Sequence, residues 1–329
     1  MNRAWLVAAA GLGVAGCEQV LGLPDPVLEI DAGMLGSCET GVGVTSRQFV
    51  IDALDAPTTS EERNAASFDI DRDDQPDNIV FSAISALITA EPAFDLQPTV
   101  DASLASGHLL QLIEAELGAG CAMTMLYEGE DRDMPVNPTD NFSGEESFRV
   151  VGNRRGRMAG TRTGAAVRAE TGGQAELRLP LFRGGSPIEL PLVEAQVRYE
   201  ITDDGVIEGA IGGAIRSDVV DGVVIPSFAA SLQAVVARDC NGTFPECCPS
   251  NSDGETMLGV FDANDSCAIE LVEVRDQQFV RSIFAPDVDL YDGPRLAPGR
   301  GDGIKDAVSI GIGFTAVNAF FLNPIPVDN

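Results

Sequence analysis

The chain has 329 residues, enough to bury a substantial core in one large domain or two smaller ones. Its 21 basic and 51 acidic residues give a formal net charge of −30, which repels nucleic acid and anionic lipid surfaces and attracts divalent cations. A hydrophobic content of 44% indicates a folded protein and argues against an acidic disordered tail.

The N-terminus is typical of an exported protein. Arg3 precedes the apolar run Ala4–Ala15, which is shorter than the roughly 20 residues of a membrane-spanning helix. Val14-Ala15-Gly16-Cys17 resembles the lipobox of bacterial lipoproteins, in which the cysteine is acylated and becomes the new N-terminus. We therefore expect a signal peptide over residues 1–16 and a membrane partner held through lipid on Cys17; the competing interpretation is an ordinary signal peptide with a chance cysteine. Glu18, in place of aspartate after that cysteine, favours the outer membrane by resemblance to other lipoproteins.

Six further cysteines remain, and an even set in an exported chain indicates disulfides. Four of them lie between residues 240 and 267 and are expected to pair among themselves, which leaves the first two as a pair. Zinc is the competing interpretation, but no C-x-x-C spacing occurs and the single histidine, His108, is remote. The six candidates are Cys38, Cys121, Cys240, Cys247, Cys248 and Cys267.

After a tether over residues 17–44, the pattern predicts a helical region over residues 45–120 that includes an acidic loop. Thr45 or Ser46 is expected to cap a first helix and Ser60 a second, because acids follow Ser60 in the first turn. Two apolar-striped segments, Ile79–Thr89 and Val100–Leu117, are expected to be helical as well.

The residue pattern of 121–222 predicts an antiparallel β domain. Short alternating runs occur at Phe148–Val151, Ala175–Phe182 and Glu194–Ile201, and Asp203-Asp204-Gly205 is expected to form a turn. Many short strands with glycine-containing turns favour a sandwich or a barrel-like sheet.

Residues 223–329 are expected to pack on the β domain. Pro226 suits the first turn of a helix, and the cysteine cluster follows that helix. Ala307–Leu322 carries no charge, but its period of two predicts a closing strand and not a membrane-spanning helix. The predicted fold class is α+β, with a helical N-terminal region, a central antiparallel sandwich or barrel-like sheet, and a C-terminal EF-hand-like loop before the closing strand.

The segment Asp262–Glu273 has the ligand spacing of an EF-hand loop, which needs oxygen ligands at positions 1, 3 and 5, a backbone carbonyl at 7 and a glutamate at 12. Cys267 replaces the glycine expected at position 6, where a positive φ is costly for a residue with a Cβ, and a disulfide through Cys267 is expected to hold that turn. The competing interpretation is an acidic surface turn. The candidate ligands are Asp262, Asn264, Ser266, Ala268 and Glu273.

Two further acidic segments are candidate calcium sites. Residues 69–77 are similar to the loops of dockerin-type and thrombospondin-type calcium repeats, with Asp74 at the usual glycine position and no acid at position 12. The third candidate is split, with two aspartates before an apparent insertion and two after it. The candidate ligands are Asp69, Asp71, Asp73 and Asp77 in the first segment, and Asp287, Asp289, Asp302 and Asp306 in the second.

Together, the lipobox, Phe68–Asp71, the loop Asp262–Glu273 and Pro286–Leu290 leading to Gly311–Val317 resemble lipoproteins of myxobacterial type, a resemblance that brings no established activity. We expect a lipid-anchored, calcium-binding, non-enzymatic envelope protein with a binding or structural role and with an envelope protein or polysaccharide as partner. The alternative is a carbohydrate-active hydrolase that uses a carboxylate pair in the β-rich domain.

Overall fold

The computed structural model describes residue 38 and residues 43–90, 96–133, 137–151, 157–170, 172–180, 187–202, 205 and 207–322. The expected signal peptide and Cys17 lie outside the described residues. Residues Asp31–Asn329 form one compact unit, and all the structure described below belongs to it.

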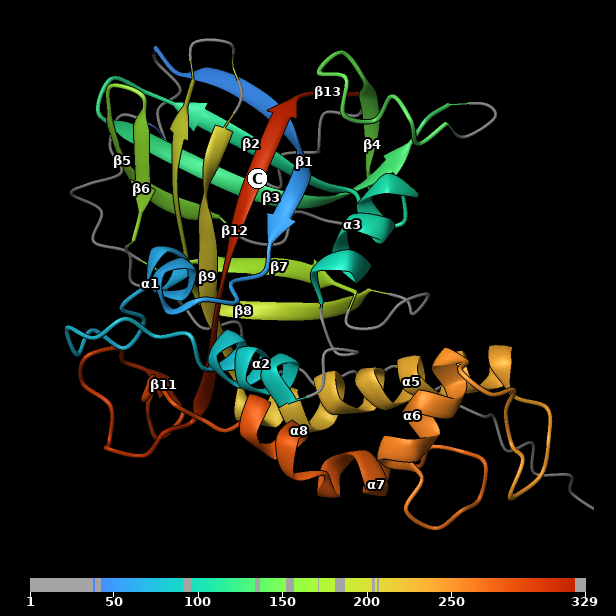
Figure 1. Cartoon of the computed structure of the whole chain (residues 1–329). Helices are drawn as coiled ribbons and strands as arrows, with labels where there is room; N and C mark the ends of the chain where they lie inside the picture. The colour runs from blue at the N-terminus through green and yellow to red at the C-terminus, as the bar shows by residue number, and fades with distance from the viewer. Residues whose placement is uncertain are drawn as a thin grey trace, which may run out of the picture. The chain divides into compact units, whose positions relative to one another are not determined.

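Antiparallel strands of this unit close into a barrel (Figure 1). They follow one another around the ring in chain order, and the ring closes because β1 pairs with β12 and β3 pairs with β5. This arrangement confirms the mixed α+β class; for the sheet, which the sequence left open between a sandwich and a barrel-like form, the antiparallel strands form a closed ring. The barrel strands are β1 (Thr45–Asp55), β2 (Gln111–Leu117), β3 (Cys121–Asp131), β5 (Met158–Thr163), β6 (Ala166–Ala169), β8 (Ile188–Ile201), β9 (Ile207–Arg216) and β12 (Ala307–Asn318).

Short strands extend the barrel at its sides. β4 (Ser147–Val151) pairs with β3, and β13 (Phe320–Phe321) pairs with β4 in parallel. β7 (Gln174–Leu179) pairs with β8, and β10 (Tyr291–Asp292) forms a separate hairpin with β11 (Arg295–Leu296).

Side chains fill the interior of the barrel. Thr124 on β3 and Tyr199 on β8 are both buried, and their hydroxyl oxygens lie 3.0 Å apart. Since β5 and β6 separate these two strands in the ring, this contact crosses the interior. An eight-stranded barrel is just wide enough for its own side chains to fill it, and this barrel has a packed core.

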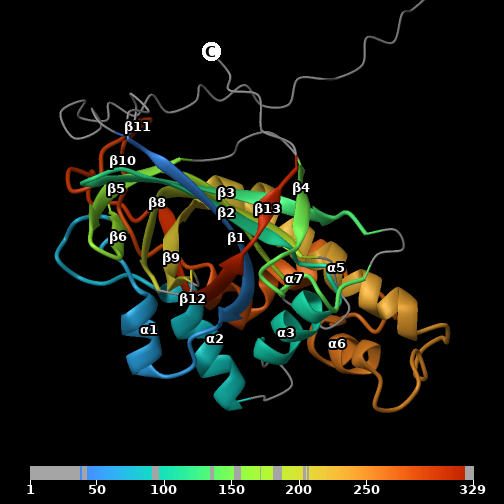
Figure 2. The ribbon, with the colours of Figure 1, turned by 90° about the horizontal axis from the view of Figure 1, so that it is seen from above.

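The helices belong to two connections between neighbouring barrel strands. Figure 1 shows α2 and α5 to α8 gathered below the strands, and Figure 2 shows β1 between β2 and β12 from above. The connection from β1 to β2 contains α1 (Ser60–Ala66), α2 (Ile79–Ala90) and α3 (Gln97–Ala105). The connection from β9 to β12 contains α4 (Ser217–Val219), the π-helix η2 (Val220–Val224), α5 (Ile225–Asp239), α6 (Asp253–Phe261), α7 (Leu271–Asp276) and α8 (Gln278–Ile283).

Among the described residues, one helical stretch, Ser217–Asp239, is long and apolar enough to cross a membrane. Half of its apolar window is buried inside the structure, and Phe228, Leu232 and Val235 belong to the main core. This is the packing of a core helix, and Pro226 lies in the first turn of α5, the longest helix of this stretch, as predicted.

Two predicted helices are wrong. The first, starting at Thr45 or Ser46, is strand β1, and the C-terminal part of Val100–Leu117 is strand β2. In β1 the consecutive residues Phe49, Val50 and Ile51 are all fully buried, because both faces of the strand are covered. Over these three residues the strand is continuously apolar and shows no period of two, and a short apolar run of this kind cannot be told from part of a buried helix.

Candidate metal centre where two acidic segments meet

The candidate site lies against one face of strand β12. Its apolar side chains at Val308, Ile310 and Ile312 enter the main core, while Ser309 and Gly311 lie on the opposite face. There Asn78 makes two hydrogen bonds to the backbone of Gly311, of 2.8 and 3.1 Å. A Cβ at Gly311 would lie 2.1 Å from the carbonyl oxygen of Ala66, so glycine is needed for the C-terminal end of α1 to approach the strand.

The first acidic segment, residues 69–77, forms a closed loop beside this face of β12. The backbone of Phe68 and Asp77 pairs at its neck, and the buried Phe68 and Ile70 alternate with Asp69 and Asp71. Asp69 accepts backbone hydrogen bonds from Asp73 (2.9 Å) and Asp74 (3.2 Å), which curls the loop around its first carboxylate.

The second acidic segment, residues 287–306, lies beside the first. The two halves of the split candidate come together, because Val288 and Ala307 pair and Asp306 accepts hydrogen bonds from the backbone of Leu290 and Tyr291. Asp287 accepts hydrogen bonds from the backbone and hydroxyl of Ser309.

Asp289 and Asp302 lie in the same second segment. The Oδ2 atom of Asp289 accepts the N–H of Gly303 at 2.6 Å, and Asp302 accepts that of Ile304 at 3.0 Å. The Oδ1 atom of Asp289 is buried and has no hydrogen-bond partner among the described residues. The insertion predicted within this candidate is therefore a loop whose end, at Gly303, comes back to Asp289 near its beginning.

Asp71 lies at the junction of the two segments. Its Oδ2 atom accepts hydrogen bonds from Nζ of Lys305 at 3.0 Å and from the backbone N–H of Asp289 at 3.3 Å. Its side chain is only 4% exposed, and its Oδ1 atom has no hydrogen-bond partner among the described residues. Carboxylate oxygens of Asp69, Asp71 and Asp77 lie within 4.8 Å of one another. A buried carboxylate oxygen without a donor, inside a group of acids, fits a cation.

The electrostatics of the junction favour a positive charge. Burial, together with the charges of Asp71, Asp287 and Asp73, raises the pKa of Asp77 to about 7, although the N–H of Ile70 acts in the opposite direction. Burial also raises the pKa of Asp287. For Lys305, burial acts to lower the pKa, but the hydrogen bond and charge of Asp71 and the charges of Asp73 and Asp77 outweigh burial and raise it.

The EF-hand-like segment Asp262–Glu273 is a separate loop between α6 and α7. Asp262 accepts backbone hydrogen bonds of 2.8 Å from Ser266 and from Cys267, which are positions 5 and 6 of the loop. Asp69, at position 1 of the first acidic segment, accepts hydrogen bonds from the same two positions. Positions 4 and 6 have positive φ in both loops, namely Arg72, Asp74, Asp265 and Cys267. The first six residues of the two loops, almost 200 residues apart in the chain, therefore form the same kind of turn.

The two loops differ in the acid that closes them. In the EF-hand-like loop both carboxylate oxygens of Glu273 accept hydrogen bonds from backbone N–H groups. The donors are Ala263 at 2.9 Å, Asn264 at 3.2 Å and Glu270 at 2.9 Å. In the first loop Asp77, at position 9, accepts the N–H of position 2 in the same way. Asn264 and Ser266 are exposed, and the hydroxyl of Ser266 donates to the carbonyl of Ala268 at 3.2 Å. In the EF-hand-like loop, backbone N–H groups of the loop therefore donate to both oxygens of Glu273. At the junction, by contrast, the Oδ1 atom of Asp71 accepts no hydrogen bond from the described residues.

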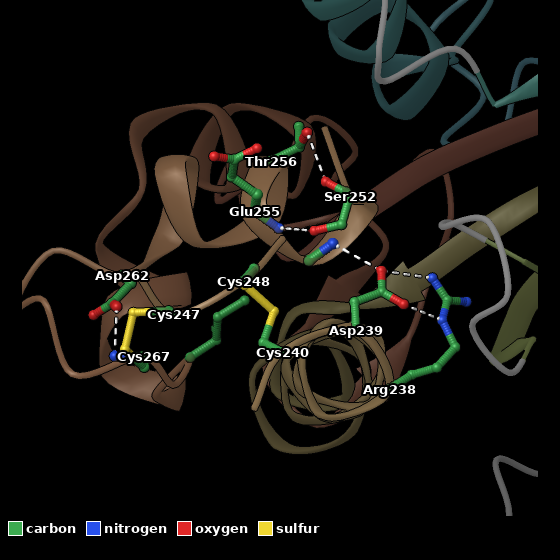
Figure 3. Close-up of a disulfide and its surroundings, with 12 residues drawn as sticks. Arg238, Asp239, Cys240, Cys247, Cys248, Ser252, Glu255, Thr256, Asp262 and Cys267 are labelled. Carbon is green, nitrogen blue, oxygen red and sulfur yellow. Dashed lines mark hydrogen bonds and ion pairs between the residues drawn. A yellow bond between two sulfur atoms is a disulfide. The ribbon is translucent and has the colours of Figure 1, made fainter. Parts of the chain in front are cut away.

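Disulfides hold the EF-hand-like loop to the neighbouring helices (Figure 3). Cys247 bonds to Cys267, and Cys240, at the end of α5, bonds to Cys248. The third disulfide joins Cys38 to Cys121, as expected from the sequence. The pairing within the cluster, which the sequence left open, therefore joins two adjacent cysteines to different partners.

Two charged groups gave no signal in the sequence: a second group of acids, and an ion pair between the buried Glu194 and the half-exposed Arg72. Carboxylate oxygens of Asp133, Asp140 and Glu146 lie within 4.8 Å of one another, and no calcium-loop spacing connects these residues. Glu194, 2% exposed and at a bulge of β8 with a φ of +47°, pairs with Arg72 at 3.4 Å. Its location on a regular alternating strand gave no signal of this role.

Comparisons of the chain with protein-family models, with curated proteins and with solved structures find no match.

Proposed function

We propose that the chain is an exported, lipid-anchored envelope protein whose fold is stabilised by bound calcium and which acts without catalysis, in binding or structural support. The observation that carries the calcium proposal is the open, buried Oδ1 atom of Asp71 at the junction of two acidic segments. Carboxylate oxygens are the ligands that Ca²⁺ prefers.

Calcium would be held by Asp69, Asp71 and Asp77, with Asp289 beside them. The ion would neutralise carboxylates that otherwise repel one another, and it would tie the connection between β1 and β2 to the connection between β9 and β12. The EF-hand-like loop, which begins with the same kind of turn as residues 69–77, is the second candidate for an ion.

The export part of the proposal rests on the lipobox and on the disulfides. Disulfides persist in oxidising compartments, and three are present among the described residues. Lipid on Cys17 would place the compact unit at a membrane surface, where an envelope protein or a polysaccharide is the proposed partner. A net charge of −30 makes an anionic polymer an unfavourable partner.

Calcium binding is tested by titration calorimetry and thermal melting of the chain beginning at Glu18, with calcium against chelator. At a free calcium concentration 100 times Kd, one site adds about 2.7 kcal/mol to the free energy of unfolding, which raises the melting temperature by about 5 °C. Asp71→Asn keeps the shape of the side chain and removes its charge, and we expect this variant to lose that shift.

The matched controls are Asp262→Asn in the EF-hand-like loop and Asp133→Asn in the other acidic group. A calcium response that survives Asp71→Asn and disappears with Asp262→Asn would move the site to the EF-hand-like loop. No heat and no shift for the wild-type chain would refute the calcium proposal altogether.

Lipidation is tested by labelling cells that express the full chain with a radioactive fatty acid. We expect label on the wild-type protein, none on Cys17→Ser, and release of the variant from the membrane fraction, because the acyl chains supply the membrane affinity. Label that persists on Cys17→Ser would contradict an anchor at this cysteine.

A further inference from the structure

Lys305 is the only lysine of the chain, and it lies at the acidic junction. Its Nζ atom is 3.0 Å from Oδ2 of Asp71, and its side chain is 46% exposed while that of Asp71 is 4% exposed. The lysine therefore reaches a buried carboxylate from the solvent side. The carboxylate is fixed, whereas a flexible four-carbon stem leaves the ammonium group free to move.

The other cation of the first segment does not serve the junction. Arg72 pairs with Glu194 at 3.4 Å, and among the described residues it makes no ion pair with Asp69, Asp71 or Asp77. Among the described residues, Lys305 is the one basic side chain with an ion pair to this group. It supplies the positive charge that the calcium-free junction requires.

An ammonium group and a divalent ion cannot both occupy the immediate neighbourhood of Asp71 without strong repulsion, since like charges a few ångströms apart repel. The carboxylate of Asp71 is part of the oxygen group that would bind the ion, and its Oδ2 atom is the one that Lys305 contacts. The ion and the ammonium group therefore oppose each other at this carboxylate.

We propose that Lys305 is a built-in competitor of the divalent ion at the acidic junction. Without the ion, its ammonium group neutralises Asp71 and keeps the two segments together; when calcium binds, the lysine moves into solvent. The protein then keeps its fold when calcium is scarce, and it binds calcium more weakly than its carboxylates alone would allow. This inference rests on the proposed calcium function.

The single lysine makes the displacement measurable. We would treat the chain beginning at Glu18 with a trace of acetic anhydride and follow acetylation of Lys305 by mass spectrometry, with the N-terminal amine as internal reference. Calcium is expected to accelerate acetylation of Lys305 by about threefold or more relative to that reference, the change expected when an ordinary ion pair is broken. An unchanged relative rate at saturating calcium would overturn the displacement.

A substitution gives the second arm of the test. Lys305→Met keeps the length of the side chain and removes its charge, and we expect the Kd for calcium, measured by calorimetry, to fall about tenfold while the melting temperature in chelator falls. The control is Arg281→Met, which changes the net charge equally but breaks an exposed ion pair with Asp276 outside the two acidic segments, and its Kd is expected to stay at the wild-type value.

The outcomes separate this inference from the proposed function. If the wild type binds calcium and Lys305→Met binds it equally well, Lys305 is no competitor and the calcium function stands. If only Lys305→Met binds calcium, the lysine excludes the ion from the wild-type chain, so the competition is shown and the proposed calcium function falls. If neither binds calcium up to millimolar concentrations, both proposals fall.

Discussion

Cys267 has a side chain at a position where the backbone favours glycine. Its φ is +62°, and its N–H donates to Asp262 at 2.8 Å, which fixes the turn of the EF-hand-like loop. The left-handed region costs a residue with a Cβ about 1–2 kcal/mol. The disulfide to Cys247 holds the residue there, while in the first loop Asp74 takes the same conformation at φ +65° without a cross-link. The expected disulfide through Cys267 is present.

Replacing Cys247 and Cys267 together by serine is expected to lower the free energy of unfolding by about 3 kcal/mol, because the bond closes a loop with a sequence separation of 20. The variant Cys247→Ser with Cys267→Gly is expected to be more stable than the double serine variant by about 1 kcal/mol, since glycine adopts this φ without strain. Urea denaturation measures both. Equal stability of the two variants would show that position 267 carries no strain.

At the scale of elements, the short helix α1 depends on its first turn. Thr59 caps it, and Glu62 accepts hydrogen bonds of 2.9 Å from the backbone of Thr58 and of Thr59. These bonds lower the pKa of Glu62 to about 2. The helix ends at Ala66, whose carbonyl group lies against Gly311 of β12. The end of α1 therefore positions Phe68, where the first acidic loop begins.

The pKa of Glu62 gives α1 a defined response to pH. A carboxyl group whose pKa is lowered in the folded state contributes stability above its ordinary pKa, and this contribution is lost as pH falls through the folded value. We expect the wild type to melt at a higher temperature than Glu62→Gln at pH 6, and the difference to shrink between pH 4.5 and 2. A difference that does not change over this range would contradict the role of the charged carboxylate.

At the scale of the whole compact unit, the closure of the barrel brings the acidic segments together. β1 and β12 are antiparallel neighbours with Asp55 opposite Gly313, so the end of β1 and the beginning of β12 lie at the same end of the barrel. The connection that leaves β1 carries Asp71, and the connection that enters β12 carries Asp289 and Lys305. The contact between Lys305 and Asp71 joins residues 234 positions apart.

The sequence by itself determined the features that depend on short stretches of chain. The curled conformation of residues 69–77 and of Asp262–Glu273 follows from side chains that accept N–H groups four and five residues later. The alternation of β12 predicted a strand because one of its faces enters the core and the other carries small residues. The cysteine count predicted the bond between Cys38 and Cys121.

Only the tertiary structure decided which of these pieces lie together. β1 is a strand because β12 and β2 pair with its two edges and hydrophobic clusters cover both of its faces, which no local period reveals. Sequence spacing treated the two acidic segments as separate candidates, and the pairing of β1 with β12 made them one junction. Burial of Asp71 and its contact with Lys305 depend on packing between connections far apart in the chain, because a hydrogen bond of this kind is set by distance in space and not by spacing in sequence.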